Sequence, residues 1–396
     1  MTETARGFIE IGSDRRFKDG QNIGGDTFLC RRSANGERTI SVLSDGLGSG
    51  VKAGVLSTLT ATMAVNCIER NVPIERTARI IMETLPVCRT RRISYATFTI
   101  VDINRDGIAR VIEYDNPTCV WLRGGELYSP PRTTVEVERK NGTRARLHFS
   151  EMKADIGDRI IFFSDGVSQS GMGTPAHPLG WGEEGVRGSL ATVVANDPEI
   201  SAVRLAGKLV AESARMDAYR AHDDITCGVI YFRRPRKLLV ASGPPLDPTV
   251  DAELAERIRN FDGRRIVAGG TTGNIVAREF GVKPRICMDR LDPEIPPYAS
   301  MDGVEMVTEG IITLARTSEY LEAETPPEQL PRNAAGLMAE YLLESDSIEF
   351  AVGTRINQAH QDPNVPVQLE LRRAAVQRLA DILNRKFLKE TSISYL

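Results

Sequence analysis

The sequence changes its pattern of secondary structure at RRPRK, residues 233–237. Before this segment, short alternating or β-branched runs are typical of an antiparallel β region. After it, strand, loop and helix alternate, which is typical of a parallel sheet flanked by helices. A length of 396 residues also favours two domains. We predict an α+β domain over residues 1–234 and a smaller α/β domain over residues 238–396.

The first domain is expected to combine antiparallel strands with helices that stand apart from them. Apolar residues at i, i+3 and i+4 predict two consecutive helices in residues 49–71 and 73–87, and a third helix is predicted over Glu199–Ala214. This separation indicates a layered fold. The predicted strands are 8–11, 26–31, 39–44, 96–102, 108–114, 119–122, 144–149, 159–164 and 225–232.

The second domain is expected to repeat a strand followed by a helix, which favours a parallel sheet. We recognise no family for it, and its proline-rich segments are interpreted as connections between elements. The predicted pairs are 237–245 with Thr249–Phe261, 264–270 with Thr272–Phe280, 303–310 with Ile311–Leu321, and 347–353 with Val367–Leu388.

The composition excludes several classes of protein. With 50 Lys and Arg against 53 Asp and Glu, there is no basic excess for binding nucleic acid. No apolar stretch approaches the ~20 residues of a membrane span, and the N-terminus lacks the apolar core of a signal peptide, so we expect a cytoplasmic protein. The four histidines show no zinc spacing. The six cysteines lack CxxC pairs and are expected to be reduced thiols: Cys30, Cys67, Cys88, Cys119, Cys227 and Cys287.

Four aspartates recur at the ends of apolar strands, often beside glycine. They lie in GGDTFL, ISVLSDGLGSG, RIIFFSDGVSQS and HDDITCGVIYF, as Asp26, Asp45, Asp165 and Asp224. A single Asp-Gly is usually a turn. Two copies of an apolar strand followed by Ser-Asp-Gly are harder to explain as turns, and gathered carboxylates suit hard divalent cations such as Mg²⁺ and Mn²⁺.

In order and type, these segments resemble the metal-dependent protein phosphatases (PPM family), in particular the bacterial branch of the stage II sporulation protein E phosphatase domain and the stressosome phosphatase. The similarity covers about residues 7–232. It includes GGDTFL, SDGLGSGVKAG, the hairpin IEYDNPTCVWLRGG, GDRIIFFSDGVSQS and HDDITCGVI. The resemblance implies an antiparallel β-sandwich flanked by helices and a phosphoserine/phosphothreonine phosphatase.

Two Mn²⁺ or Mg²⁺ ions are implied by this resemblance. Asp45 would bridge them and the Gly46 carbonyl would contact the second ion. Asp165 and Asp224 would complete the first ion's shell, while Asp26 would hold the second through water. The ions would generate a hydroxide that attacks phosphorus, so no protein nucleophile is required. By strand alternation, Asp223 is expected to face away from the site.

The sequence also departs from the family pattern. Leu47 stands where eukaryotic members carry a histidine that protonates the leaving group. No phosphate-clamping arginine is identifiable, and Arg15, Arg16 and Lys18 are interpreted as solvated charges. His177 and His222 are interpreted as structural. The helices within residues 51–87 are expected to pack on a sheet through a buried stripe that includes Val55 and Met63, and in the resembled branch they also control assembly of the metal site.

In the second domain, RRIVAGGTTGNIVAREFG leads from a strand through glycines into a helix. Such a turn offers free N–H groups and partial positive charge to an anion. The candidate ligand residues are Gly269, Gly270, Thr271, Thr272, Gly273 and Asn274. If the sheet is parallel, residues 242–244 and 308–309 would lie at the same edge.

We therefore predict a cytoplasmic phosphatase that acts on a phosphorylated protein and is regulated by its C-terminal domain through a partner or an anionic small molecule. Two alternatives stay open: a catalytically weak phosphatase-like binding module, and a C-terminal domain that acts on a phosphorylated metabolite. The first alternative would predict a lost metal aspartate, and none is lost. The second lacks an evident base or nucleophile. A homodimer is also left open.

Overall fold

The computed structural model describes residues 7–33, 36–46, 48, 50–84, 96–138, 144–326, 329–355 and 365–396. The chain forms two compact units, Met1–Arg234 and Pro235–Leu396. The division lies within RRPRK, where the sequence pattern changes. Each unit has its own sheets and hydrophobic cores.

Unit 1 is a sandwich of two antiparallel sheets. Apolar side chains from their facing surfaces form a core in which the rings of Phe28 and Phe162 stack with centroids 5.9 Å apart. The first sheet has the order β2 (Asp26–Arg32), β3 (Arg38–Gly46), β4 (Ala96–Asn104), β5 (Ile108–Tyr114), β9 (Arg144–Lys153) and β8 (Arg132–Glu138). The second has the order β1 (Phe8–Arg16), β11 (Ile225–Arg233), β10 (Arg159–Phe163), β6 (Val120–Arg123) and β7 (Glu126–Tyr128).

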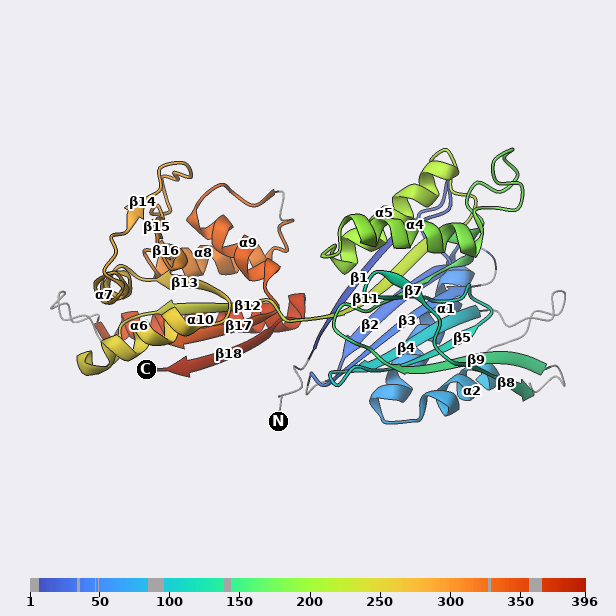
Figure 1. Ribbon diagram of the computed structural model, residues 1–396, viewed down its shortest axis with the longest axis horizontal. Coiled ribbons are helices and arrows are strands. Elements are labelled where there is room, and N and C mark those ends of the chain that lie inside the picture. The colour runs from blue at the N-terminus through green and yellow to red at the C-terminus, as the bar shows by residue number, and fades with distance from the viewer. Residues whose placement is uncertain are drawn as a thin grey trace. The chain divides into compact units, whose positions relative to one another are not determined.

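Helices cover both outer faces of the sandwich (Figure 1). The helices α1 (Val51–Glu69) and α2 (Ile74–Thr84) pack on the first sheet, and α4 (Gly182–Asn196) and α5 (Ala202–Met216) pack on the second. The predicted α+β sandwich is confirmed, as are the helices now seen as α1, α2 and α5. Residues 85–87 of the second predicted helix lie outside the described residues. The sequence prediction missed α4, in which three glycines weaken the helical signal, and the mostly exposed strands β7 and β8.

Helix α1 differs from its prediction in two ways. Its buried apolar residues are Ala53 in the first turn and Ala61, Ala64, Val65 and Ile68 in the second half. Val51, Val55 and Leu59 are exposed, so the placement of Val55 on a buried stripe was wrong. By length and composition α1 would also suffice to cross a membrane, contrary to the sequence expectation that no segment does. In this fold α1 packs along β2 and β3, and 39% of its most apolar window is buried.

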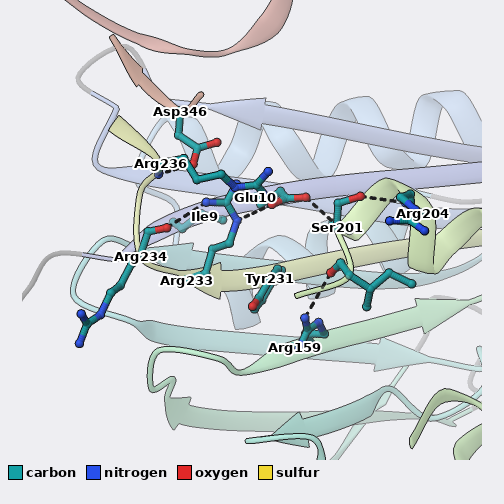
Figure 2. A network of polar contacts seen from close by, with 12 residues as sticks. Ile9, Glu10, Arg159, Ser201, Arg204, Tyr231, Arg233, Arg234, Arg236 and Asp346 are labelled. Atoms are coloured by element: carbon teal, nitrogen blue, oxygen red, sulfur yellow. Dashed lines mark hydrogen bonds and ion pairs between the residues drawn. The ribbon is translucent and has the colours of Figure 1, made fainter. Parts of the chain in front are cut away.

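The far end of β11 shows how unit 1 satisfies buried charge (Figure 2). The guanidinium of Arg233 donates to Glu10, whose second oxygen accepts from the N–H of Ala202 at 2.8 Å. Arg159 lies 3.6 Å from the ring centroid of Tyr231 and donates to the carbonyl of Pro198 at 2.7 Å. These contacts join β1, β10 and β11 to the start of α5.

Unit 2 is an α/β domain whose central strands are all parallel, as predicted. Two short antiparallel strands extend one edge. The sheet order is β14 (Arg285–Ile286), β15 (Ala299–Met301), β16 (Val304–Thr308), β13 (Arg264–Ala268), β12 (Lys237–Ser242), β17 (Ser347–Val352) and β18 (Glu390–Tyr395). The chain starts at the central β12, adds β13 and β16 on one side, and then crosses to β17 on the other side.

Helices flank both faces of this sheet (Figure 1). The helices α6 (Asp251–Asn260) and α7 (Gly270–Phe280) pack on one face, and α8 (Ile311–Glu322), α9 (Ala334–Glu344) and α10 (Val365–Phe387) pack on the other. The four predicted strand and helix pairs are present. The sequence prediction missed α9 and β18, because a nearly continuous apolar run and a short polar strand give no clear period.

Candidate metal centre

The four predicted aspartates come together at one edge of the sandwich. Asp26 opens β2 and pairs directly with Asp45 near the end of β3. Asp165 follows β10 and begins the short helix α3 (Asp165–Ser168), while Asp224 immediately precedes β11. Since β10 and β11 are neighbours in the other sheet, the ends of strands from both sheets supply the cluster.

Glycines let the backbone approach closely around these carboxylates. A Cβ on Gly46 would lie 2.2 Å from the Ala53 carbonyl oxygen in the first turn of α1, and one on Gly166 would lie 2.2 Å from the Asp224 carbonyl oxygen. A Cβ on Gly25 would lie 3.2 Å from the Gly46 carbonyl oxygen and 3.3 Å from Asp224 Oδ2. The Gly46 carbonyl and the Asp224 carboxylate therefore flank one small space beside β2.

Only some of the carboxylate oxygens have hydrogen-bond donors. Asp224 accepts from the backbone N–H groups of Lys18, at 2.9 Å, and of Gly25. The Gln169 side chain donates to Asp165 Oδ2 at 2.7 Å. In contrast, Asp26 Oδ2 and Asp165 Oδ1 are buried and have no hydrogen-bond partner in the described part of the chain. Buried oxygens of this kind are costly unless a ligand or ion satisfies them.

Burial and mutual repulsion raise the pKa values of three of these carboxyls. Burial raises the pKa of Asp26 to about 7; the nearby hydroxyls of Thr226 and Ser164 oppose this shift, and the charges of Asp224 and Asp165 add to it. Burial first, and then the neighbouring aspartates, place the pKa of Asp45 well above its usual value. The pKa of Asp165 is raised by burial and by the charge of Asp223. Burial, with the crowding of like charges added to it, favours the protonated carboxyls, and a bound cation would replace those protons.

The donors present fit a divalent cation such as Mg²⁺ or Mn²⁺. They are carboxylate and carbonyl oxygens, which hard cations prefer, and two of them have no other partner. Among the described residues, however, no three His, Cys, Asp or Glu side chains are arranged as a ready ligand shell. The carboxylates are clustered and would have to turn toward the ions on binding.

Asp223 and Ser164 take part in the cluster in ways that the sequence did not indicate. The charge of Asp223 raises the pKa of both Asp165 and Asp45, so Asp223 adds to the negative charge of the cluster. Strand alternation does not apply to it, because β11 begins only at Ile225. Ser164, from the second Ser-Asp-Gly, accepts from the Thr226 N–H at 3.0 Å and fixes the start of β11 against the end of β10.

The remaining residues considered from the sequence have mostly structural contacts. Arg16 donates to the Tyr219 carbonyl, and the exposed His222 lies 4.0 Å from Asp217. His177 lies in a loop and packs against Gly171. Leu47 and Cys88 lie outside the described residues.

A cavity of about 650 Å³ adjoins the cluster. Asp26 and Arg15 both line it, and the Arg15 side chain is exposed, as expected for a solvated charge. Much of the remaining wall is apolar and comes from Ile23 and the exposed side of α1, including Val55 and Leu59. The cavity can therefore hold an anionic group near Asp26 next to an apolar surface.

The glycine-rich segment of unit 2 lies in a different environment. Gly269 ends the turn after β13, and residues 270–274 form the start of α7. Gly273 faces Val307 of β16, where a Cβ would lie 2.7 Å from the valine side chain, so Gly273 serves packing. The Asn274 side chain is exposed on α7.

Several solved structures are similar to part of this chain. Similar solved structures include the PP2C phosphatase domain with a regulatory fragment of SpoIIE from Bacillus subtilis, with a TM-score of 0.46, 18% identity, and coverage of 58% of this chain and 65% of that chain. The RsbU and RsbW domains of Rv1364c from Mycobacterium tuberculosis have a TM-score of 0.43 and 18% identity, with coverage of 64% of this chain and 68% of that chain. RsbX in complex with magnesium has a TM-score of 0.40 and 16% identity, with coverage of 58% of this chain and 98% of that chain. The chain thus spans just under two thirds of the first of these structures.

No match was found among curated proteins. The family model of stage II sporulation protein E (SpoIIE) matches residues 35–233, just over half of the 396 residues. This match includes Asp45, Asp165 and Asp224, and it ends where unit 1 ends. The chain therefore belongs to the stage II sporulation protein E family, whose members are metal-dependent protein phosphatases.

Proposed function

We propose that this protein is a cytoplasmic phosphoserine/phosphothreonine protein phosphatase that depends on two Mn²⁺ or Mg²⁺ ions. The observation that carries the proposal is the buried acidic cluster, in which Asp26 and Asp165 each keep an oxygen without a hydrogen-bond partner. A family of metal-dependent phosphatases supplies the reaction type.

Each residue of the cluster has a distinct task in this proposal. Asp45, Asp165 and Asp224 would hold the ions, with the Gly46 carbonyl and Asp26 completing the oxygen donors. When bound, the ions would lower the pKa of a water and stabilise charge on the phosphoryl oxygens. The N–H groups of Lys18 and Gly25 fix the orientation of Asp224.

The neighbouring cavity supports a protein as the substrate. Arg15 can attract the phosphate toward Asp26, while Ile23, Val55 and Leu59 offer apolar surface to the residues around a phosphoserine. The guanidinium of Arg15 lies 5.0 Å from the centroid of Phe17, whose ring packs against Gly24. This contact limits the positions that the arginine can take.

Regulation by unit 2 is the second part of the proposal. Unit 1 has complete hydrophobic cores of its own, so residues 1–234 can be compared with the full chain in the same assay. We expect the two proteins to differ in the Mn²⁺ concentration that gives half-maximal activity. Identical metal dependence and rate would contradict regulation by unit 2 and leave the phosphatase proposal intact.

The decisive experiment is a Mn²⁺-dependent assay on phosphoserine, phosphothreonine and phosphotyrosine peptides. We expect the first two to be hydrolysed in preference to the third. Asp45→Asn and Asp224→Asn should each lower the rate by more than about a hundredfold, because each removes a charged metal ligand. Calorimetric titration with Mn²⁺ should show weakened binding in the same variants.

Asp106→Asn is a matched control for these variants. Asp106 and Gly107 also follow a strand, but they form the turn between β4 and β5, and the Asp106 side chain is exposed. This variant should keep full activity. Undiminished hydrolysis by Asp45→Asn, or by the wild type in EDTA, would disprove the proposed metal centre.

A further inference from the structure

We propose that unit 2 binds a phosphorylated small molecule at the carboxyl edge of its parallel sheet, with Arg372 and the first turn of α7 as the phosphate ligands. The place follows from the strand order. The chain reverses direction across the sheet between β12 and β17, and such a reversal opens a crevice at the carboxyl ends of the two strands. These ends are Ser242 with Gly243, and Val352 with Gly353.

Buried hydroxyls without hydrogen-bond partners collect at this edge. Ser242 and Thr308 occupy the last positions of β12 and β16, and both are paired with Ala268 of β13, so all three share one face of the sheet. Thr272 and Thr313 lie in the first turns of α7 and α8. All four side chains are at most 3% exposed, and none of their hydroxyls has a partner among the residues that the structure describes. Four unsatisfied hydroxyls at one sheet edge are unusual in a folded protein and indicate a missing polar ligand or ordered water.

Glycines keep the space above these hydroxyls open. A Cβ on Gly269 would lie 3.3 Å from Thr272 Oγ1, 3.8 Å from the Gly243 nitrogen and 3.9 Å from the Glu309 carbonyl oxygen. The Thr272 hydroxyl is therefore directed at the point where the turns after three strands meet. Next to it, Gly270 at the start of α7 faces open space: a Cβ there would have no atom of the described residues within 4 Å. The N–H groups at the start of a helix carry partial positive charge, so a helix start that faces open space suits an anion.

Arg372 of α10 brings positive charge to the same edge. Its Nη1 lies 2.5 Å from where a Cβ on Gly243 would stand, so the absence of a side chain at Gly243 makes room for the guanidinium. Arg372 is half-buried, and within the part of the chain that the structure describes it donates a long hydrogen bond of 3.5 Å to the Gly353 carbonyl. Burial lowers the pKa of Arg372, while the charge of Glu309 partly offsets this effect. A half-buried guanidinium with so weak a partner is well placed to bind a phosphate.

These features favour a phosphate ester over free inorganic phosphate or a carboxylate. Arg372 and the N-terminus of α7 account for the anionic group, and the hydroxyls account for further polar atoms on the ligand. The carboxylate of Glu309 accepts from the Ile312 N–H at 3.1 Å and so covers the start of α8, leaving the start of α7 for the phosphate. A mononucleotide or a sugar phosphate has the required combination of groups.

The test is calorimetric titration of the full chain with AMP, GMP, ribose 5-phosphate and inorganic phosphate, with adenosine as the uncharged comparison. EDTA is present throughout, so that phosphate cannot bind through metal ions in unit 1. We expect at least one phosphate ester to bind, at least about tenfold more tightly than inorganic phosphate, and adenosine not to bind. If none of the esters binds, or if adenosine binds as well as AMP, the proposal is wrong.

Variants then locate the site. Arg372→Gln should weaken binding of the ester about tenfold or more, and Gly270→Val should block it by filling the open space. Arg378→Gln is the matched control, because Arg378 is an exposed arginine on the same helix. Circular dichroism verifies that each variant is folded. Unchanged affinity in folded Arg372→Gln and Gly270→Val, or equal losses in Arg378→Gln, would overturn the assignment. The phosphatase assay in Mn²⁺ is independent of either result.

Discussion

Both units place their candidate sites where strands end, but the two edges are built from opposite chemistry. In unit 1, antiparallel strands of two sheets bring carboxylates together, and burial and repulsion raise the pKa values of Asp26, Asp45 and Asp165. In unit 2, one parallel sheet aligns neutral hydroxyls beside a half-buried arginine. The first edge carries an excess of negative charge, and the second presents a guanidinium with only a weak hydrogen bond.

This difference relates the charge of an unsatisfied polar group to the charge of the ligand that it can bind. Oxygens that repel one another can be stabilised by a cation, whereas a guanidinium and helix N–H groups can be stabilised by an anion. The opposite end of β11 provides the contrast, because both oxygens of Glu10 have donors there. At the far end of β11, buried charge is thus satisfied by hydrogen bonds within the protein. At the two candidate sites, the charged groups still require a ligand.

The glycines of the two edges offer the strongest test of this contrast. Gly166→Ala would put a Cβ 2.2 Å from the Asp224 carbonyl oxygen, so the backbone of this metal ligand must shift. We expect a loss of about 1–3 kcal/mol in the free energy of unfolding, together with loss of Mn²⁺-dependent hydrolysis. Urea denaturation and the peptide assay measure the two effects.

Gly270→Ala is the corresponding change in unit 2. Because its Cβ would meet open space at the start of α7, we expect the free energy of unfolding to stay equal or to rise by up to about 1 kcal/mol. Gly188→Ala, on the exposed side of α4, is a second control with open space. If Gly166→Ala were as stable and as active as Gly270→Ala, the glycines of the acidic edge would not be needed for close approach of the backbone.

The pH dependence of stability gives a second test of the acidic edge. The pKa of Asp26 is raised from 3.8 to about 7 in the folded state, so folding favours the protonated form. The metal-free protein should therefore lose stability as pH rises from about 4 to about 7, by up to a few kcal/mol, and keep its full stability below that window. Mn²⁺ at neutral pH should restore the lost stability.

Tryptophan fluorescence can follow this effect in unit 1 alone, since both tryptophans of the chain, Trp121 and Trp181, lie there. Asp26→Asn should flatten the dependence on pH, because the amide does not titrate. A metal-free stability that rises between pH 4 and 7 would contradict the crowding of carboxylates at this edge.

Much of the acidic edge could be predicted from the sequence, and little of the other edge could. Strand ends direct side chains, so repeated Ser-Asp-Gly after apolar strands indicated Asp45 and Asp165 without a structure. Arg372 carries no such signal. It lies far along the chain from Gly243, and only the crossing from β12 to β17 brings the two together. Likewise, α1 carries apolar residues on several sides, so the spacing of its apolar residues could not show that Val55 faces a cavity.

The smallest expected effect concerns the unpartnered hydroxyls of unit 2. Thr313→Val keeps the shape of a side chain whose hydroxyl has no partner, so we expect the free energy of unfolding of unit 2 to rise by about 1 kcal/mol. Thr317, one turn later on α8, has a hydroxyl that donates to the carbonyls of Thr313, at 2.8 Å, and Ala335. Thr317→Val removes this hydroxyl and should lower the free energy of unfolding by about 1 kcal/mol. Differential scanning calorimetry of the ligand-free chain measures both. Equal destabilisation by the two changes would mean that the Thr313 hydroxyl is already satisfied by ordered water. The hydroxyls of this edge would then belong to the fold, in the same way as Glu10 does at the far end of β11.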